Sequence, residues 1–248
     1  MSTPAVGSSW LGDRQRRDLL LTALGLVALL GWDASQADMA LMQLFGNHSG
    51  FAWRDAWLTR DLLHQGGRML AWAVLGLLVV DVIRPLVAGP SRRQRGWGVG
   101  LVLIGLLLVP GLKRLSLTSC PWDLVDFGGL ARHVSHWQFG VADGGPGHCF
   151  PSGHAVAAFA FVGVYFAWRG HRPALARGAL GLVLLFGLAF GLAQMARGAH
   201  FASHTLWSGW LCWTVGMSAS LLAGALAKMN ERRGGTAATA LLQGIVNR

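Results

Sequence analysis

Six apolar segments that approach membrane-spanning length dominate this chain and constrain its fold more than any other feature. They lie at about residues 19–32, 69–87, 97–112, 151–168, 178–196 and 206–227. A helix needs about 20 apolar residues to cross the hydrocarbon core of a bilayer. Hydrophobic residues make up 53% of the 248 residues and charged residues 13%, which is about half the charged share of a typical soluble domain. The sequence therefore predicts an all-α fold, a polytopic membrane helix bundle with six transmembrane helices.

The polar segments complete the predicted organisation. Residues 1–18 are expected to form a cytoplasmic N-terminal segment, residues 19–227 a six-span membrane domain, and residues 228–248 a cytoplasmic tail. In the first loop, residues 33–66, aromatic residues and leucines alternate with arginines and aspartates, which indicates one or two helices lying in the membrane surface. The basic flank and short apolar run of the first segment also fit a signal peptide. That alternative leaves the sidedness of the later segments unchanged.

The distribution of charge predicts the orientation in the membrane. Six spans place both termini on one side, and the termini with the loops at 84–95 and 169–177 contain 14 of the 21 Lys and Arg residues. The opposite loops contain seven of the 11 acidic residues. The positive-inside rule then places both termini in the cytoplasm, and we expect the membrane to be a bacterial-type inner membrane. Because the basic residues lie between apolar segments, the charge of +10 indicates a lipid bilayer as partner and not nucleic acid.

The motif Pro151-Ser152-Gly153-His154 stands where the longest polar loop enters the fourth apolar segment. Ser152 suits a helix N-cap, and Gly153 allows main-chain N–H groups to approach an anion. His154 follows in the first turn, where free N–H groups favour a negative ligand. An imidazole at that position can donate a proton near neutral pH. The motif predicts half of a phosphate-handling site, although the same residues also fit an ordinary helix start.

A second cluster, residues 194–204, lies between the fifth and sixth segments on the same predicted outer face. If the cluster is helical, Arg197, His200 and His204 share one side, since positions i, i+3 and i+7 align. Burying these groups near a membrane boundary is costly. A functional site is therefore favoured over the alternative of interfacial anchoring with core hydrogen bonds.

A group of histidines and cations of this kind suits phosphoryl transfer at a lipid headgroup. One imidazole can attack phosphorus and carry it, a second can protonate the leaving oxygen, and fixed cations stabilise the transferred group. This chemistry requires no metal and no other cofactor. The three cysteines, Cys120, Cys149 and Cys212, also lack the spacing of a metal site.

With these residues the chain resembles the type 2 phosphatidic acid phosphatase superfamily of membrane lipid phosphatases, which is related to the vanadium haloperoxidases. The family shows the motifs Lys-x6-Arg-Pro, Pro-Ser-Gly-His and Ser-Arg-x5-His-x3-Asp. The second is intact at residues 151–154, whereas in the first Lys113 is followed after six residues by Cys120, which replaces the family arginine. The resemblance covers roughly residues 69–227, with matching motif order and sidedness.

The third motif also diverges. Gln194 occupies the position of the family arginine, and His204 occupies that of the family aspartate, whereas His200 matches the nucleophilic histidine. The resemblance implies His200 as nucleophile, His154 as general acid and His204 as the residue that orients the nucleophile. The residues expected to bind phosphate are Lys113, Arg114, Ser152, Gly153 and Arg197, with the two arginines replacing the missing family cations. A second assignment, with His204 as nucleophile and Ser208 as its partner, stays open.

The resemblance implies a metal-independent lipid phosphatase that works through a phosphohistidine at the periplasmic face. A phospholipid, an isoprenoid pyrophosphate or lipid A would each fit as the substrate. One alternative is a lipid-to-lipid phosphotransferase of the same family. Another is a catalytically silent member that binds or moves lipid, which the missing arginines favour and the retained histidines oppose. A membrane histidine protein that binds metal or haem fits less well, because the histidines cluster at one surface.

A disulfide between Cys120 and Cys149 follows from the resemblance. In the family the first and second motifs meet around one phosphate, so the two cysteines are expected to be neighbours. Both lie on predicted outer loops, where disulfides persist in an oxidising compartment. Two separate thiols are the alternative. Cys212 lies in the middle of a predicted span and is expected to be an inert small apolar residue.

Overall fold

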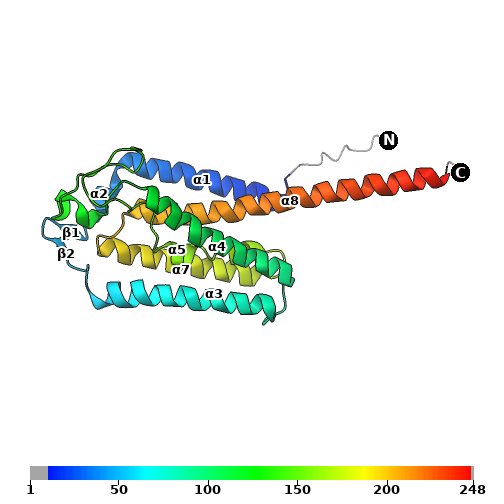
Figure 1. Cartoon of the computed structure of the whole chain (residues 1–248), viewed down its shortest axis with the longest axis horizontal. Coiled ribbons are helices and arrows are strands. Elements are labelled where there is room, and N and C mark those ends of the chain that lie inside the picture. The colour runs from blue at the N-terminus through cyan, green and yellow to red at the C-terminus, as the bar shows by residue number, and fades with distance from the viewer. Residues whose placement is uncertain (1–10, 247–248) are drawn as a thin grey trace.

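The computed structural model describes residues 11–246, with side chains described to residue 230. The helices of the bundle lie roughly side by side, and the short elements gather at one end, which we call the outer end (Figure 1). The elements in chain order are α1 (Asp13–Ser35), α2 (Ala37–Met42), β1 (Gly46–Asn47), β2 (Gly50–Phe51), η1 (Leu58–Gly66), α3 (Gly67–Ile83), α4 (Arg92–Leu115), η2 (Pro121–Asp123), η3 (Val125–Phe127), α5 (Val156–Phe159), α6 (Val162–Trp168), α7 (Pro173–Ala196) and α8 (Ala202–Val246).

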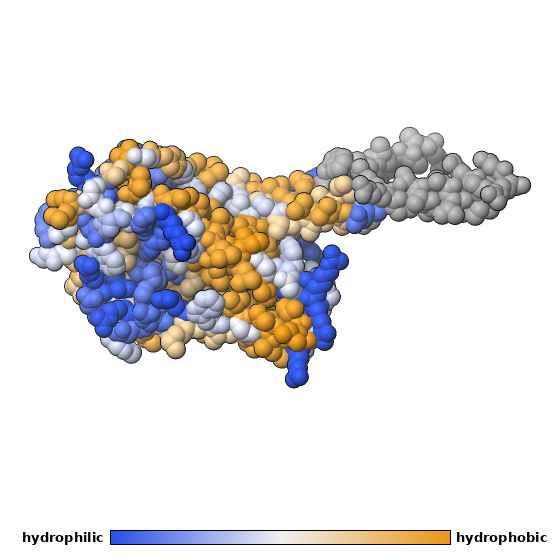
Figure 2. All heavy atoms as spheres, viewed as in Figure 1, coloured by the Kyte–Doolittle hydropathy of each residue, from blue (hydrophilic) through white to orange (hydrophobic). Residues whose placement is uncertain are grey.

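Five helices within the described residues are long and apolar enough to cross a membrane. They are α1, the continuous helix Leu58–Ile83, α4, α7 and α8 over Ala202–Asn230. The chain is therefore a multi-pass helical membrane protein. Large apolar side chains such as Leu77 and Leu107 are exposed on its surface. On the face drawn in Figure 2, apolar residues form a band between two more polar ends, as expected of a surface that faces lipid.

The structure does not confirm the predicted number of six spans, because the helix of the fourth segment is short and broken. Its helical part is 13 residues long, Val156–Trp168, and it divides into α5 and α6. At the break, Phe161 donates to the carbonyl of Ala158, and Gly163 donates to that of Ala160. In both bonds the donor and acceptor residues are three positions apart, as in a 3₁₀-helix, which is wound more tightly than an α-helix. Residues 151–155 form the turn of the candidate site and add nothing to the span.

The other boundaries also extend beyond the predicted apolar segments. Residues 58–66, expected to lie in the membrane surface, form the π-helix η1, which runs directly into α3. The rest of the first outer loop contains α2 and the hairpin β1–β2, which pairs Gly46 with Phe51 and Asn47 with Gly50. At the other terminus, α8 continues through the predicted tail to Val246.

Glycines allow α4 to pack closely against α6. A Cβ atom on Gly98 would lie 2.8 Å from Cβ of Ala167, and one on Gly163 would lie 2.8 Å from Cβ of Leu101. Small residues at helix contacts are typical of membrane bundles, where lipid tails give no hydrophobic drive for helix association. The core beside this contact contains Val102, which is fully buried.

Two buried ion pairs join the helices at the end opposite the short elements, which we call the inner end. Arg169, just after α6, donates to Asp18 of α1 at 2.6 Å and to Ser220 of α8 at 2.8 Å. Arg95 of α4 pairs with Asp81 of α3. Removing one partner of a buried pair would leave an uncompensated charge. These pairs therefore fix the inner end of the bundle.

Candidate active site

The three motif segments meet at the outer end of the bundle. The end of α4 contributes Lys113, the turn before α5 contributes His154, the α7–α8 connection contributes His200, and α8 begins just before His204. This convergence follows from the alternating direction of the helices: α4 and α7 end at the outer end, whereas α5 and α8 begin there. The geometry thus brings together residues far apart in the sequence.

A Schellman motif ends α7 and positions His200. The N–H of Gly198 donates to the carbonyl of Met195, and that of Ala199 donates to the carbonyl of Gln194. This pair of bonds requires a left-handed residue just after the helix, and Gly198 has φ 73°. The carbonyl of Gly198 accepts from the N–H of Trp122 at 2.9 Å, which ties the first-motif loop to the same turn. His200 follows directly and is 1% exposed.

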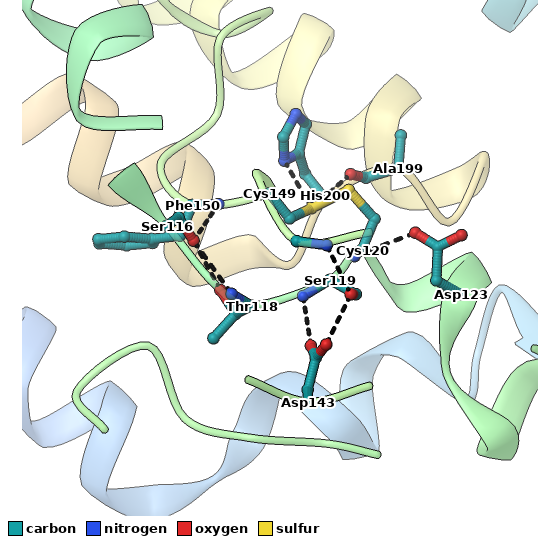
Figure 3. Close-up of a disulfide and its surroundings, with 11 residues drawn as sticks. Ser116, Thr118, Ser119, Cys120, Asp123, Asp143, Cys149, Phe150, Ala199 and His200 are labelled. Atoms are coloured by element: carbon teal, nitrogen blue, oxygen red, sulfur yellow. Dashed lines mark hydrogen bonds between the residues drawn. A yellow bond between two sulfur atoms is a disulfide. The ribbon is translucent and has the colours of Figure 1, made fainter. Parts of the chain in front are cut away.

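Cys120 and Cys149 form a disulfide beside His200 (Figure 3). Their Cα atoms are 5.1 Å apart. Sγ of Cys149 lies 3.5 Å from Nδ1 of His200 and 3.2 Å from the carbonyl oxygen of Ala199. A disulfide sulfur carries no proton and is a weak acceptor. Since Nδ1 faces the sulfur, Nε2 is the His200 nitrogen available to a substrate.

A polar network holds the two cysteine loops in place, as Figure 3 also shows. Ser119 donates from its main-chain N–H and from its hydroxyl to the buried carboxylate of Asp143. The N–H of Cys149 donates to the carbonyl of Thr118 at 3.0 Å. The first-motif loop and the segment before Pro151 are thus joined by hydrogen bonds as well as by the disulfide.

The Ser152 turn is anchored to the start of α8. The N–H of Ser152 donates to the carbonyl of His204 at 3.0 Å, and the hydroxyl of Ser208 lies 2.9 Å from the carbonyls of both residues. The hydroxyl of Ser152 accepts from the N–H of Ala155 at 3.4 Å, so it caps the turn. Within residues 11–246, the N–H groups of Gly153 and His154 have no main-chain partner.

Lys113 lies directly above this turn. A Cβ atom on Gly153 would lie 3.6 Å from Cδ and 3.9 Å from Nζ of Lys113. The ammonium therefore lies beside a turn with two free N–H groups, a combination that suits an oxyanion. Arg114 is exposed and points about 100° away from Lys113 around the helix. The structure does not bring Arg114 into the site.

Three imidazoles lie close together beside this turn. The ring centroids of His154 and His200 are 6.0 Å apart. The rings of His200 and His204 meet edge to face at 5.7 Å, and in the described structure Nδ1 of His204 has no hydrogen-bond partner. The expected ring-nitrogen hydrogen bond between these two histidines is therefore not formed here.

Burial favours the neutral form of His154 and of His200. It lowers the pKa of His154 to about 3, and the neighbouring His64, Lys113 and Arg197 add to the shift. Burial also lowers the pKa of His200 well below its ordinary value, and Lys113 adds to this effect. A neutral imidazole is the nucleophilic form. An anion bound beside His154 would raise its pKa, because an opposite charge favours protonation.

Arg197 occupies the neighbourhood of the missing third-motif arginine. It caps α7, is 8% exposed, and its Nε donates to the carbonyl of Arg54 at 2.8 Å. Its Nη1 lies 3.5 Å from Oε1 of Gln194. The guanidinium is thus fixed beside the side chain that replaces the family arginine.

Two further residues of the site were missed from sequence. His64 of η1 packs against His154, with ring centroids 4.0 Å apart and the ring planes tilted by 44°. His64 and Arg68 line one narrow crevice together with His154 and Gln194. The available signal was their four-residue spacing just before the second apolar segment, since such pairs share a helix face.

An apolar groove leads away from the site between α3 and α4. Its volume is about 400 Å³, and its polar end is lined by Arg68, Gly153 and His154. The remaining lining residues are apolar side chains of α3, α4 and α5, and include Trp72, Leu75, Leu103, Leu107 and Pro110. Leu107 and Trp72 are 74% and 66% exposed, so the groove opens toward the bilayer.

Metal-binding side chains gather at one place among the described residues, Cys120, Cys149 and His200. A metal binds the thiolate form of cysteine, and here both sulfurs are used by the disulfide. This donor set does not fit a metal.

Comparison with known families decides the assignment. A family model described as the PAP2 superfamily matches residues 96–227, more than half of the chain. The chain belongs to the PAP2 superfamily. These are the type 2 phosphatidic acid phosphatases, so membership indicates a phosphatase-type hydrolase with a lipid phosphate substrate. No curated protein and no solved structure matches the chain. The PAP2 match contains Lys113, His154 and His200, but it begins after α3, so His64 and Arg68 lie outside it.

Proposed function

We propose that this PAP2 protein is a metal-independent lipid phosphatase that forms a phosphohistidine on His200. The observation that carries the proposal is the pair His154–His200, whose ring centroids lie 6.0 Å apart. Lys113 and the free N–H groups of Gly153 and His154 border the same space. A phosphoryl group placed there would have a nucleophile on one side and a proton donor on the other.

The reaction has two steps. Nε2 of His200 attacks phosphorus, the bond from phosphorus to the lipid oxygen breaks, and His154 gives its proton to that oxygen. Water then attacks the phosphohistidine, the phosphorus–nitrogen bond breaks, and His154 takes a proton from the water. Lys113, Arg197 and the two N–H groups stabilise the charge on the transferred oxygens, which is the largest contribution such a site can make.

The assignment of His200 rather than His204 as nucleophile rests on their surroundings. The hydroxyl of Ser208, the suggested partner of His204, lies against the main-chain carbonyls of Ser152 and His204. His200 faces His154, whereas His204 lies behind His200 against Phe150. His204 then orients the nucleophile by packing edge to face against its ring.

The groove between α3 and α4 supports a lipid substrate over a soluble one, because its apolar walls reach the bilayer from the phosphate-binding turn. The excess of basic residues at the opposite end supports a site that faces the periplasm of an inner membrane. The loss of arginine at Cys120 and Gln194 supports a silent lipid-binding protein, but Lys113 and Arg197 leave two cations in place. We therefore favour the enzyme.

Phosphate release by the purified full-length protein tests the proposal. The substrates are phosphatidate, phosphatidylglycerol phosphate, an isoprenyl diphosphate and lipid A, each with EDTA present. His200→Ala and His154→Ala should each lower release by at least about 100-fold, because each removes a group of the chemical step. His171→Ala, an exposed histidine at the inner end, is the matched control.

Loss of activity in EDTA with recovery on adding a divalent ion would contradict the mechanism. Phosphate that appears on a second lipid instead of in solution would identify a phosphotransferase. No turnover of any substrate in the panel would favour the silent protein.

A further inference from the structure

We propose that a basic cavity at the inner end of the bundle binds the headgroup of an anionic phospholipid. The cavity has a volume of about 840 Å³ and is lined by residues of α1, α4, α8, the end of α6 and the turn after it. This volume is within the range of ligand pockets. The proposal concerns a second site, at the opposite end from His200, and does not depend on the phosphatase function.

Two unpaired arginines on different helices line the cavity. Arg14 is in the first turn of α1 and Arg93 in the first turn of α4, and both are exposed. Among the described residues, no side chain pairs with either guanidinium, and no Asp or Glu lines the cavity. A guanidinium binds phosphate oxygens with its planar fork of N–H donors. The charge of the cavity is therefore complementary to an anion.

Arg169 also lines the cavity, but its charge is compensated. It donates to Asp18 at 2.6 Å and lies over the ring of Phe166 at 4.5 Å from the centroid. Its side chain is only 11% exposed. Arg169 therefore forms part of the wall, and Arg14 and Arg93 are the cations available to a ligand.

Two glutamines add neutral donors next to these arginines. Oε1 of Gln15 accepts from the N–H of Gly12 at 3.1 Å, and Oε1 of Gln94 accepts from the N–H of Ser91 at 2.9 Å. Both glutamines line the cavity. Because these bonds use the amide oxygens, the amide N–H groups are left to donate to phosphate oxygens.

An apolar wall of the same cavity favours a lipid over a soluble anion. This wall contains Trp97 of α4, Phe166 of α6, and Ala223 and Ala227 of α8. The two alanines are exposed, and they belong to the part of α8 that is long and apolar enough to cross a membrane. Acyl chains would cover this wall, whereas free phosphate would not. Basic pockets between membrane helices are typical binding sites of anionic headgroups.

The termini of the chain lack the charge to occupy the cavity themselves. Residues 1–12 contain no acidic residue. Residues 231–248 contain one acidic residue, Glu231, and three arginines. Neither sequence is complementary to Arg14 and Arg93, so the occupant is an external anion.

Lipid binding to the full-length protein in detergent, measured by native mass spectrometry, tests the site. The probes are dioleoyl phosphatidylglycerol and dioleoyl phosphatidylethanolamine, which have the same chains and differ in headgroup charge. The wild-type protein should bind one phosphatidylglycerol at least about 10-fold more tightly than phosphatidylethanolamine. Arg14→Gln combined with Arg93→Gln should weaken phosphatidylglycerol binding by about 30-fold, which corresponds to about 1 kcal/mol for each arginine.

Arg16→Gln combined with Arg92→Gln is the matched control. It removes the same charge from the same two helices, at exposed positions that do not line the cavity. Its affinity for phosphatidylglycerol should stay within about twofold of the wild type, because salt screens exposed charges at a distance. An equal loss in both double variants would overturn the proposal, since general surface charge would then explain the binding.

Two further outcomes would contradict a lipid site. Equal affinity for the two lipids would mean that the arginines bind no headgroup. Displacement of phosphatidylglycerol by inorganic phosphate would identify a site for a soluble anion.

Thermal unfolding in detergent gives an independent readout. Phosphatidylglycerol should raise the unfolding temperature of the wild type and of the control variant, because a ligand stabilises the folded state that binds it. It should raise that of the Arg14→Gln, Arg93→Gln variant less. Without lipid, the two double variants should unfold at the same temperature, since all four arginines are exposed. No rise in the wild type would contradict the proposal.

Discussion

Gln194 is the residue at which the site departs most clearly from the family motif. Its amide cannot replace a guanidinium as a charge partner for phosphate. Arg197 lies one helical turn further on, and its Nη1 is 3.5 Å from the Gln194 side chain. Because a main-chain carbonyl fixes its Nε, only the far edge of the guanidinium is free to face the site. We infer that this edge supplies the missing charge.

Arg197→Lys tests that inference. The substitution keeps the charge but loses the planar fork that pairs with phosphate and with the carbonyl of Arg54. We expect kcat/KM to fall by about 10- to 100-fold, the effect of losing one hydrogen bond to a charged group. Steady-state phosphate release measures it. A rate near that of the wild type would mean that Arg197 only anchors α7 at the interface.

At the level of elements, the end of α7 determines where His200 lies. Gly198 must adopt a positive φ for the Schellman motif to form. A Cβ atom there would also overlap the ring of Phe51, which belongs to the β1–β2 hairpin. Gly198 thus positions three parts of the site: the hairpin of the first outer loop, the loop of the first motif, and the nucleophile His200.

Gly198→Ala should therefore lower both stability and activity. The left-handed conformation alone costs a non-glycine residue about 1–2 kcal/mol, and the overlap with Phe51 adds to this. Thermal unfolding in detergent and phosphate release are the two measurements. Gly181→Ala, inside α7 with open space around it, should unfold at or above the wild-type temperature. Similar behaviour of the two variants would contradict the role of Gly198.

The boundaries of elements were less predictable from sequence than their existence. Hydropathy locates the apolar middle of a span, but it does not show which contacts the polar side chains at the ends of a helix make. Residues 58–66 contain charged side chains and still extend a span, because His64 packs against His154 in the site. The fourth segment has an apolar composition, yet it breaks at Ala160–Phe161 while packed among α3, α4, α7 and α8.

At the level of the whole molecule, the order of the apolar segments was the most informative property of the sequence. Counting spans placed His154 and His200 on one face, and the structure brings them together at the outer end. The family assignment was likewise accessible from the intact second motif and is confirmed by the PAP2 match. The contact of His64 with His154 was not accessible, because a ring contact between residues 90 positions apart leaves no local pattern in the sequence. The polar chemistry thus occupies one end of a bundle whose middle faces lipid.

Capture of the covalent intermediate tests the central claim most directly. The full-length protein is mixed in EDTA with a lipid phosphate labelled on its terminal phosphorus, quenched in alkali and digested. Fragmentation of the peptide that follows Arg197 distinguishes His200 from His204. We predict phosphate on the His200 imidazole, absent in His200→Ala and formed without any divalent ion. Phosphate on His204, or turnover with no covalent phosphate at all, would contradict the mechanism.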